Sequence, residues 1–499
     1  MALSLRRSSS LPALCASSLM QHIINKPQMN CFQLFASFSA LGFVPSNQTL
    51  QKLLKLPSVH EGGIPANVRF CSAQSKRRAA EAEELPTFRY AGKTTKRHSN
   101  VHVCGFSYTG ALGIPHFIVL KGTTHRKRKQ FVANPYKLPM PKKITSVACG
   151  YGFTLLSSNS LDSPKVWGTG INTDSQLGFQ ARSHGMENGL SYVIAPARIE
   201  LPLTRPRNTR VTQVACGRAH SIILTDTEGV FSLGNNAHGQ CGRQVIEYED
   251  YRSSKVIHRI KGIDDDIIQV ACGHDHSLFL TCKGEVYSCG WGADGQTGQG
   301  HYNSNSVPTK VEGDLQGEKI SQIASFSDCC LAVSENGDLF GWGNSEYNQL
   351  SVVTEETQVN IPRHLRFPDV GRIKSAAVGG SICAIVNEDG NIFTWGYGIL
   401  GKGPNLVESK YPQCIPPTLM GQTTVNPEVK VSKVICGLHH FAALTDRGDL
   451  YTWGTNGTGC LGIGHLGNQY FPLRVYVPGE VLDVACGVDH TVILSKSVI

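Results

Sequence analysis

Charged side chains are scarce in this chain of 499 residues, and no apolar run reaches the length of a membrane span. Asp, Glu, Lys and Arg together make up 17% of the residues, while hydrophobic residues make up 40%. That balance excludes a mostly disordered or coiled-coil protein. The apolar stretch Cys31–Val44 contains polar residues and is shorter than the roughly 20 residues that a spanning helix needs. We therefore expect a large folded core and no transmembrane segment.

Acidic residues are missing from the first 60 positions, and the first one is Glu61. The same segment is rich in Ser and carries five basic residues, which are Arg6, Arg7, Lys26, Lys52 and Lys55. A basic, Ser-rich and acid-free N-terminus is typical of a mitochondrial transit peptide. The sequence predicts a mitochondrial targeting segment over residues 1–70 and a linker over 71–100. The expected location is the mitochondrial matrix, either free or peripheral on the inner membrane, and a plain disordered tail is the alternative for the segment.

A second acid-free segment spans residues 121–143 and carries eight Lys or Arg residues. Removing these eight charges and the five N-terminal ones from the net charge of +9 leaves −4 for the remainder. The positive charge is therefore local. One interpretation is a solvated surface loop that lengthens the connection before Val147. The other is an arm that binds RNA or another anion, because basic residues alternate there with Phe131 and Tyr136. The candidate binding residues are Arg126, Lys127, Arg128, Lys129, Lys142 and Lys143.

Two interleaved motifs repeat from residue 101 onward. The first is an apolar strand, a Gly and a loop that closes on Gly, as in 166-VWGTGINTDSQLG-178, 286-VYSCGWGADGQTG-298 and 450-LYTWGTNGTGCLG-462. Its aligned glycines are Gly105, Gly170, Gly234, Gly290, Gly343, Gly396 and Gly454. The second motif runs 147-VACGYGFTLL, 214-VACGRAHSII, 270-VACGHDHSLF, 323-IASFSDCCLA, 376-AAVGGSICAI, 434-VICGLHHFAA and 484-VACGVDHTVI. Seven copies of each motif indicate seven units of 53 to 65 residues.

Each unit has the composition of a small antiparallel sheet. An apolar strand is followed by a second strand, a Gly-containing hairpin turn such as Asn336-Gly337, and a third strand with an aromatic residue. Trp342, Trp395 and Trp453 are expected to fill space between adjacent sheets. The first motif begins at Val101 without a preceding Ala-Cys-Gly copy, and the last such copy has no strand after it. The fold class is therefore all-β, a seven-bladed β-propeller over 101–499, closed by pairing of its N- and C-terminal strands.

Cysteine and histidine recur at fixed repeat positions, and no zinc-type Cys/His spacing is present. The chain has 17 Cys, several of them in Ala-Cys-Gly. Seven spokes of a ring hold such positions too far apart for disulfides, so we interpret them as small buried residues in a reducing compartment. The motif histidines His220, His276, His440 and His490 occur once per unit, which favours a structural bond to a neighbouring loop over a metal or catalytic role. We predict no metal and no cofactor.

Units of this form, with ACGxxHS followed by a Gly-turn, an aromatic strand and GQLG, resemble the repeat of the regulator of chromosome condensation family. The resemblance covers residues 101–499 in seven copies. Together with the targeting segment, the basic insertion and 396-GYGILGKGPNLVES-409, the chain resembles the mitochondrial member of that family. WD-repeat and kelch propellers fit worse because their periods are shorter. The resemblance implies a propeller face that binds a GTPase, with Asp275, His439 and Asp489, each directly before a motif His, as candidate contacts.

The resemblance implies a binding protein with no covalent chemistry. The first expected function is guanine-nucleotide exchange on a mitochondrial GTPase, a dynamin-like GTPase of inner-membrane fusion. The alternative is an assembly factor that binds mitochondrial ribosomal RNA for the large ribosomal subunit, and a structural scaffold is the third interpretation. The segment 396-GYGILGKG-403 superficially matches nucleotide-binding loops. Gly403 stands where Ser or Thr should follow the Lys, and the segment aligns with the Gly-rich loops of the first repeat motif. We therefore predict no nucleotide binding there.

Overall fold

The computed structural model describes residues 99–118, 129–181 and 189–496. The predicted targeting segment, nearly all of the predicted linker, and the candidate residues Arg126, Lys127 and Arg128 lie outside the described residues.

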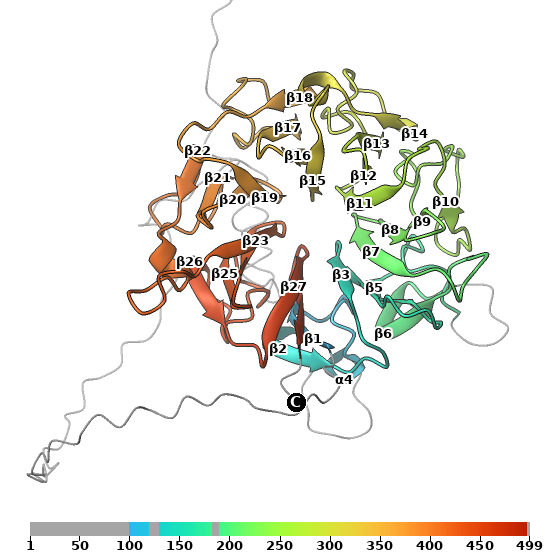
Figure 1. Cartoon of the computed structure of the whole chain (residues 1–499). Coiled ribbons are helices and arrows are strands. Elements are labelled where there is room, and N and C mark those ends of the chain that lie inside the picture. The colour runs from blue at the N-terminus through green and yellow to red at the C-terminus, as the bar shows by residue number, and fades with distance from the viewer. Residues whose placement is uncertain (1–98, 119–128, 182–188, 497–499) are drawn as a thin grey trace, which may run out of the picture. The chain divides into compact units, whose positions relative to one another are not determined.

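Seven four-stranded antiparallel sheets are arranged around a central axis like the blades of a propeller (Figure 1). Six blades each take four consecutive strands. These are blade 1 with β3 (Ser146–Cys149), β4 (Phe153–Ser157), β5 (Val166–Ile171) and β6 (Tyr192–Ile199); blade 2 with β7 (Val211–Cys216), β8 (His220–Thr225), β9 (Val230–Gly234) and β10 (His258–Arg259); blade 3 with β11 (Ile267–Cys272), β12 (His276–Thr281), β13 (Val286–Gly290) and β14 (Asn305–Lys310); blade 4 with β15 (Ile320–Ser325), β16 (Cys329–Ser334), β17 (Leu339–Asn344) and β18 (Gln358–His364); blade 5 with β19 (Ile373–Val378), β20 (Ile382–Asn387), β21 (Ile392–Tyr397) and β22 (Glu408–Cys414); and blade 6 with β23 (Val431–Cys436), β24 (His440–Thr445), β25 (Leu450–Gly454) and β26 (Gln469–Val475).

The seventh sheet, the closing blade, joins the two ends of the propeller. It holds β27 (Glu480–Cys486), β28 (His490–Lys496), β1 (Ser99–Phe106) and β2 (Phe131–Leu138). Strand β1 pairs with β28 in continuous antiparallel register, with Val101 opposite Leu494 and Val103 opposite Val492. The predicted all-β fold, the seven blades and the closure by the terminal strands are confirmed. Pairing the ends in one sheet satisfies edges that an open ring would leave exposed.

The hydrophobic core lies between adjacent blades. Phe441 and Trp453 of blade 6 pack with Leu400 and Ile415 of blade 5 in one buried cluster. Trp395 of blade 5 packs likewise into the cluster of blade 4 and donates its indole N–H to the carbonyl of Gln349 at 2.8 Å. The prediction that the repeat tryptophans fill space between sheets is confirmed. The flat indole of a tryptophan presents a large apolar face to each of the two sheets that enclose it.

Glutamine side chains on the innermost strands bond each blade to the next. The amide of Gln213 donates to the carbonyl of Val270 at 3.1 Å and accepts from its N–H at 2.9 Å. Gln269 makes the same pair of bonds to Ile323, and Gln322 makes them to Ala376. These paired bonds connect blades 2, 3, 4 and 5 in series. They fix the relative register of the inner strands, which positions the loops at the ends of those strands.

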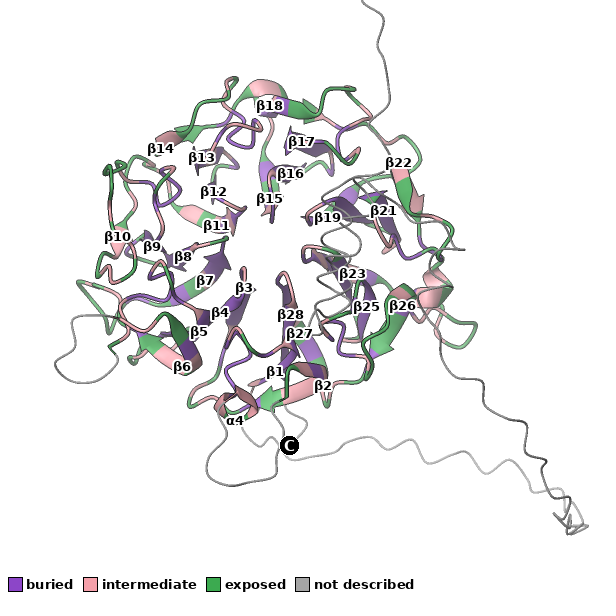
Figure 2. Ribbon diagram, turned by 180° about the vertical axis from the view of Figure 1, so that it is seen from behind, coloured by how far each residue is buried: buried purple, intermediate pink, exposed green. Residues whose placement is uncertain are grey.

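The outermost strands are the exposed edges of the blades (Figure 2). Six of them carry a Pro near a break in the pairing register: Pro135, Pro196, Pro308, Pro362, Pro412 and Pro472. Proline has no N–H to donate, so an edge strand that contains it pairs poorly with another chain. This periodic proline protects the outer rim from edge-to-edge association.

Helical structure within the described residues is confined to the short segments α4 (Pro115–Ile118), η1 (Gly313–Leu315) and η2 (Pro417–Met420). None of the helices found there is both long and apolar enough to cross a membrane.

The basic segment 121–143 is not one loop, contrary to the sequence-based interpretation. Its middle forms β2, the outer strand of the closing blade, which pairs with β1. Phe131 packs its ring 5.8 Å from that of Phe106, and Tyr136 packs edge-on against Phe117 at 5.2 Å. The two aromatic rings expected to stack on bases therefore pack against the propeller. Sequence reasoning missed this because the fourth strand of each blade has no consistent apolar pattern.

Candidate functional site

Both repeat motifs place their loops on the same face of the propeller, which we call the motif face. It is formed by the loops between the first and second strands and those between the third and fourth strands of each blade. Hydrogen bonds tie the two loop types together, as when Gln240 of blade 2 donates to Asp275 of blade 3 at 3.3 Å. The opposite face carries the turns between second and third strands and the connections from blade to blade.

The three predicted GTPase contacts all lie on the motif face, in loops between first and second strands, but not in one cluster. His439 of blade 6 and Asp489 of the closing blade are on neighbouring blades, whereas Asp275 of blade 3 is three blades away from each. Asp275 Oδ2 accepts from Arg218 at 2.6 Å, and its side chain is only 11% exposed. Asp489 Oδ1 lies 3.0 Å from Nδ1 of His490. Only His439 is exposed.

A group of side chains that we call the mouth cluster extends over blades 1 to 4 beside the central axis. Its members are Tyr151, Arg218, His274, Asp275, Phe326 and Asp328. The ring of Tyr151 from blade 1 stacks on Phe326 from blade 4 with centroids 5.7 Å apart. It also lies 4.8 Å from the ring of His274. Loops from opposite parts of the ring thus touch across the mouth of the propeller and hold it in one arrangement.

The carboxylates of the mouth cluster are already paired. Asp328 Oδ2 lies 2.6 Å from Nδ1 of His274, and its Oδ1 accepts from Gln296 at 3.1 Å. Burial raises the pKa of Asp328, but the hydrogen bonds and charges of His274, His276 and Gln296 together outweigh it and hold this pKa below the usual value. Burial, reinforced by Asp328, raises the pKa of Tyr151. The cluster is a preorganised polar surface whose outward cation is the half-exposed Arg218.

Each motif histidine bonds the neighbouring blade, as expected, although its partner is on a strand and not in a loop. Nε2 of His220 lies 3.0 Å from the hydroxyl of Ser277, and the same nitrogen of His440 lies 3.0 Å from that of Thr491. Burial lowers the pKa of His220 and His276 to about 4 and that of His440 to about 3. These three rings are neutral at physiological pH. Burial also lowers the pKa of His490, but Cys149 and Asp489 outweigh burial there and raise this pKa to about 10. A Cβ on Gly217 would lie 2.2 Å from the His220 ring, so this motif position needs glycine.

Nothing in the described part of the chain forms a recognisable catalytic or metal centre. Ser327, His274 and Asp328 lie together, yet the Ser327 hydroxyl and the carboxylate both approach Nδ1 of the histidine. A relay needs the two ring nitrogens to contact different partners, so this set is not a triad. No group of three or more His, Cys, Asp or Glu side chains in the described ranges could hold a metal ion.

The five cysteines in the inner strands are buried and free, as expected: Cys149, Cys216, Cys272, Cys436 and Cys486.

The segment that resembles a nucleotide-binding loop joins strands β21 and β22 of blade 5, where the repeat column predicts a loop. Lys402 is exposed, and its ammonium lies 3.4 Å from the Gln413 side-chain oxygen. The loop leads into a strand and not into a helix, so the backbone does not present a helix N-terminus to a phosphate.

The described basic candidates are split between the two faces. Lys129 lies on the motif face, where its ammonium is 5.1 Å from the ring centre of Phe117. Lys142 and the exposed Lys143 follow β2, on the opposite face, where Lys142 donates to the carbonyl of Asp162 at 3.2 Å. The six candidates therefore cannot all contact one anion.

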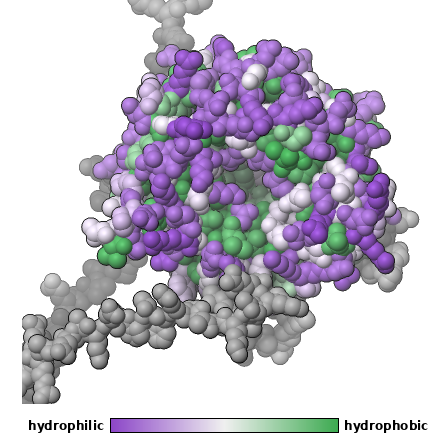
Figure 3. All heavy atoms as spheres, viewed as in Figure 1, coloured by the Kyte–Doolittle hydropathy of each residue, from purple (hydrophilic) through white to green (hydrophobic). Residues whose placement is uncertain are grey.

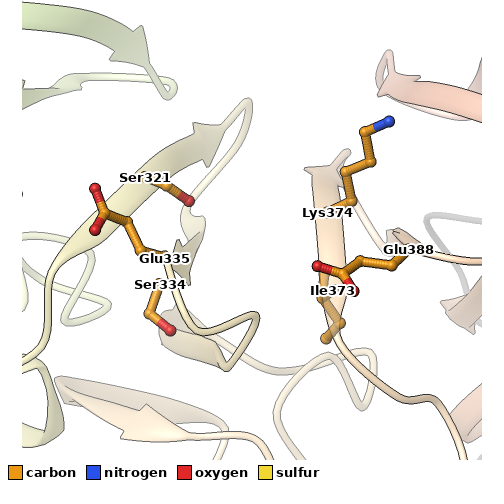
Figure 4. Close-up of a pocket in the computed structure, with 6 residues that line it drawn as sticks. All are labelled: Ser321, Ser334, Glu335, Ile373, Lys374 and Glu388. Atoms are coloured by element: carbon orange, nitrogen blue, oxygen red, sulfur yellow. The ribbon is translucent and has the colours of Figure 1, made fainter.

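Within the described residues, one hollow lies at the centre of the propeller and another lies between two blades. The central one has a volume of about 210 Å³ and is lined by the Val-Ala-Cys stretches of the inner strands. Figure 3 shows hydrophobic side chains gathered along part of its edge. The other, of about 610 Å³, lies between blades 4 and 5, with Ser321 and Glu335 on one wall and Lys374 and Glu388 on the other (Figure 4). Both of its carboxylates are neutralised, Glu335 by Lys319 and Glu388 by Arg372.

Sequence reasoning missed most of the mouth cluster. Asp328 occupies the same repeat column as Asp275 and Asp489, directly before the second strand, so alignment of the degenerate fourth copy would have found it. Tyr151 and Phe326 gave no such signal, because their contact joins blades that are far apart in the chain.

Comparison with known proteins agrees with this architecture. The RCC1-like domain profile matches residues 94–372 and 247–498. The human "RCC1-like G exchanging factor-like protein" is 59% identical over 423 residues, which are 83% of this chain and 91% of that protein. Its mouse counterpart is 58% identical over 435 residues, 86% of this chain and 94% of that protein. The ultraviolet-B receptor UVR8 of Arabidopsis thaliana is 32% identical over 66% of this chain and 69% of its own length.

Solved structures show the same fold. The crystal structure of human WBSCR16 superposes with a TM-score of 0.77 at 59% identity, covering 81% of this chain and all of that one. Prp20p of Saccharomyces cerevisiae superposes with a TM-score of 0.64 at 22% identity, over 81% of this chain and 92% of that one. The profile, the close relatives and the seven-bladed closure agree with the resemblance seen in the repeats, and the chain belongs to the RCC1-like domain family.

Proposed function

We propose that this protein is a guanine-nucleotide exchange factor of the RCC1-like type, which acts by binding a GTPase through its motif face. The observation that supports this most is the 59% identity, over 83% of the chain, to the human protein whose name describes it as an RCC1-like G exchanging factor-like protein. The preorganised polar loops of the motif face suit this role.

Exchange requires binding and no covalent step. A factor that binds the nucleotide-free GTPase best lowers the affinity of the GTPase for nucleotide, and nucleotide in turn lowers the affinity for the factor, by the same coupling free energy. The paired Asp275, Asp328 and Asp489 keep their loops in place before the partner arrives. Rigid loops reduce the entropy lost on association, which leaves more binding energy to compete with nucleotide.

The target in this proposal is a mitochondrial dynamin-like GTPase of inner-membrane fusion, with the exchange factor in the matrix or peripheral on the inner membrane. The composition of residues 1–60, basic, rich in Ser and without acid, supports import into mitochondria. Sequencing the N-terminus of the protein recovered from mitochondria tests this directly, and an intact Met1 on that protein would contradict it.

Release of labelled GDP from the purified GTPase tests exchange. Asp275→Asn, His439→Ala and Asp489→Asn together should slow the accelerated release at least tenfold, because they remove groups from three loops of the motif face. Asp389→Asn is the matched control, because Asp389 is exposed on the opposite face. If the triple variant is as active as the control, these three positions are not the contact. If the unmodified protein does not accelerate release at all, the exchange proposal fails.

A second candidate function is ribosomal RNA binding in assembly of the large mitochondrial ribosomal subunit, and the basic segment favours it. Lys129 belongs to this segment and lies within the described residues, on the motif face. It directly follows positions 126–128 in the sequence. Neutralising Arg126, Lys127, Arg128 and Lys129 should remove RNA crosslinks and reduce the slope of log affinity against log salt by about 0.7 to 0.9 for each lost phosphate contact. Unchanged crosslinks would exclude these residues. If exchange and RNA binding both fail, the scaffold interpretation remains.

A further inference from the structure

The loop between the third and fourth strands of blade 2 is longer than its counterparts in blades 1 and 3 to 6. It spans residues 235–257, against 291–304 in blade 3, and the strand that follows it, β10, has only two residues. We call residues 244–251 the hook. Because loops between third and fourth strands belong to the motif face, the hook lies on that face, at the outer side of blade 2.

Hydrophobic side chains at the hook are exposed and not packed. Tyr248 is 94% exposed and Ile246 is 58% exposed, with Val245 at 39%. Isolated exposed apolar residues are ordinary on protein surfaces, but three within four positions of one loop are a local concentration of exposed apolar side chains.

The backbone of Tyr248 has a conformation that tyrosine rarely adopts. Among the described residues, three other than glycine have positive φ: Ser175 at 57°, Asn348 at 63° and Tyr248 at 59°. Ser175 and Asn348 occupy the repeat column in which other blades have glycine, so the repeat geometry explains them. Tyr248 is the third residue of a turn closed by the Glu249 N–H and the Ile246 carbonyl at 3.3 Å, a position that favours Gly or Asn. Such outliers often mark functional positions.

The base of the hook is firmly held. Asn236 donates to the carbonyls of Arg243 and Gln244, and the hydroxyl of Ser175 donates to the carbonyl of Tyr251 at 2.7 Å. Arg243 and Glu249 form an ion pair at 2.5 Å with side chains only 12% and 13% exposed. A fixed base with an exposed apolar tip lowers the entropy cost of inserting that tip into a partner.

The charges around the tip indicate what kind of partner fits. Glu247 and Asp250 are exposed beside Tyr248, and Arg252 lies 3.4 Å from Asp250. Residues 243–252 hold three carboxylates and two arginines, so the hook and its base have a net charge of −1. This surplus of negative charge disfavours the phosphates of RNA and of anionic membranes, and it favours a basic protein surface. An aromatic residue with acidic neighbours suits an apolar pocket that Lys or Arg residues surround.

We propose that the hook is a protein-docking element, in which Ile246 and Tyr248 enter an apolar pocket bordered by basic residues on a partner protein. This function goes beyond nucleotide exchange and does not depend on it. Tyr248 keeps its unfavourable backbone conformation because that conformation directs the ring away from the propeller.

Site-specific photo-crosslinking in the full chain tests the proposal. A benzophenone amino acid replaces Tyr248 in one variant and Tyr476 in the control, since Tyr476 is 86% exposed and precedes a connection on the opposite face. The position-248 probe should label one protein, at a peptide with apolar residues and adjacent Lys or Arg. The proposal is overturned by labelling no stronger than the control, by adducts on RNA, lipid or a second copy of this chain, or by a labelled peptide without basic residues.

Substitutions then test whether the contact contributes to affinity. Ile246→Ser with Tyr248→Ser should reduce binding of the crosslinked protein at least tenfold, while Tyr476→Ser leaves it unchanged. Tyr248→Gly should raise the melting temperature, because glycine adopts positive φ freely, and should weaken binding at the same time. Retained binding by the double variant, or a lower melting temperature for Tyr248→Gly, would contradict the assignment.

Discussion

Glu228 holds the long connection from blade 1 to blade 2, and its replacement by Gln should have a large effect. The carboxylate accepts four hydrogen bonds at 2.7 to 2.8 Å, from the N–H groups of Thr204 and Arg205 and the hydroxyls of Thr204 and Thr209. Each carboxylate oxygen thus receives one backbone N–H. An amide in either orientation must place its NH₂ against one of these donors, which cannot rotate away.

The pKa of Glu228 gives the size of the stability loss that Glu228→Gln should cause. Burial raises this pKa, but the four hydrogen bonds outweigh burial and lower it from 4.5 to about 2. At about 1.4 kcal/mol per pKa unit, the preference for the charged form is about 3 kcal/mol. We expect Glu228→Gln to lose roughly 2–3 kcal/mol at pH 7. Because the folded pKa is the lower one, this contribution is complete above about pH 4.5 and disappears as the pH falls toward 2.

Thermal melting and limited trypsin digestion measure the effect. The variant should melt several degrees lower than the unmodified protein at pH 7, and trypsin should cut faster after the exposed Arg207 and Arg210. Glu355→Gln is the control, because Glu355 is exposed in a loop of blade 4. A melting temperature and a cleavage rate equal to those of the control would refute the conclusion that the Glu228 carboxylate holds the connection between blades 1 and 2.

Three further predictions concern the ring itself. Gln269→Ala removes two bonds between blades 3 and 4 and should cost about 1–2 kcal/mol in chemical denaturation, whereas Gln316→Ala, at an exposed position, should cost almost nothing. Acidification below pH 6.5 should lower the melting temperature, because His220, His276 and His440 stay neutral in the fold and take up protons once unfolded. The raised pKa of His490 adds no slope in that range, so a flat profile from pH 6 to 5 would contradict the prediction. Deleting Val481–Ile499 removes β27 and β28, so the cooperative melt should be lost, and a truncated protein that melts like the intact one would disprove closure.

The sequence alone determined the fold and the family, and it did so for a local reason. Each blade repeats the same short strands, Gly turns and buried aromatic positions, so the hydrogen-bonding and apolar pattern of one unit can be recognised seven times. The unmatched motifs at Val101 and Val484 predicted the closing blade. The once-per-unit spacing of His220 and its equivalents predicted a structural role, which their bonds to the next blade confirm. The fourth strands escaped notice because their edges are exposed and keep no apolar alternation.

The tertiary structure alone decided how the candidate site is arranged. Asp275, His439 and Asp489 share a repeat column, but only the closed ring shows that they are spread around one face and that two of the three are already hydrogen-bonded. The contact of Tyr151 with Phe326 joins blades 1 and 4 across the mouth of the ring. The positive φ of Tyr248 depends on how its loop is anchored. Such contacts come from the closure of the whole ring and from single loop conformations, and neither leaves a periodic pattern in the sequence.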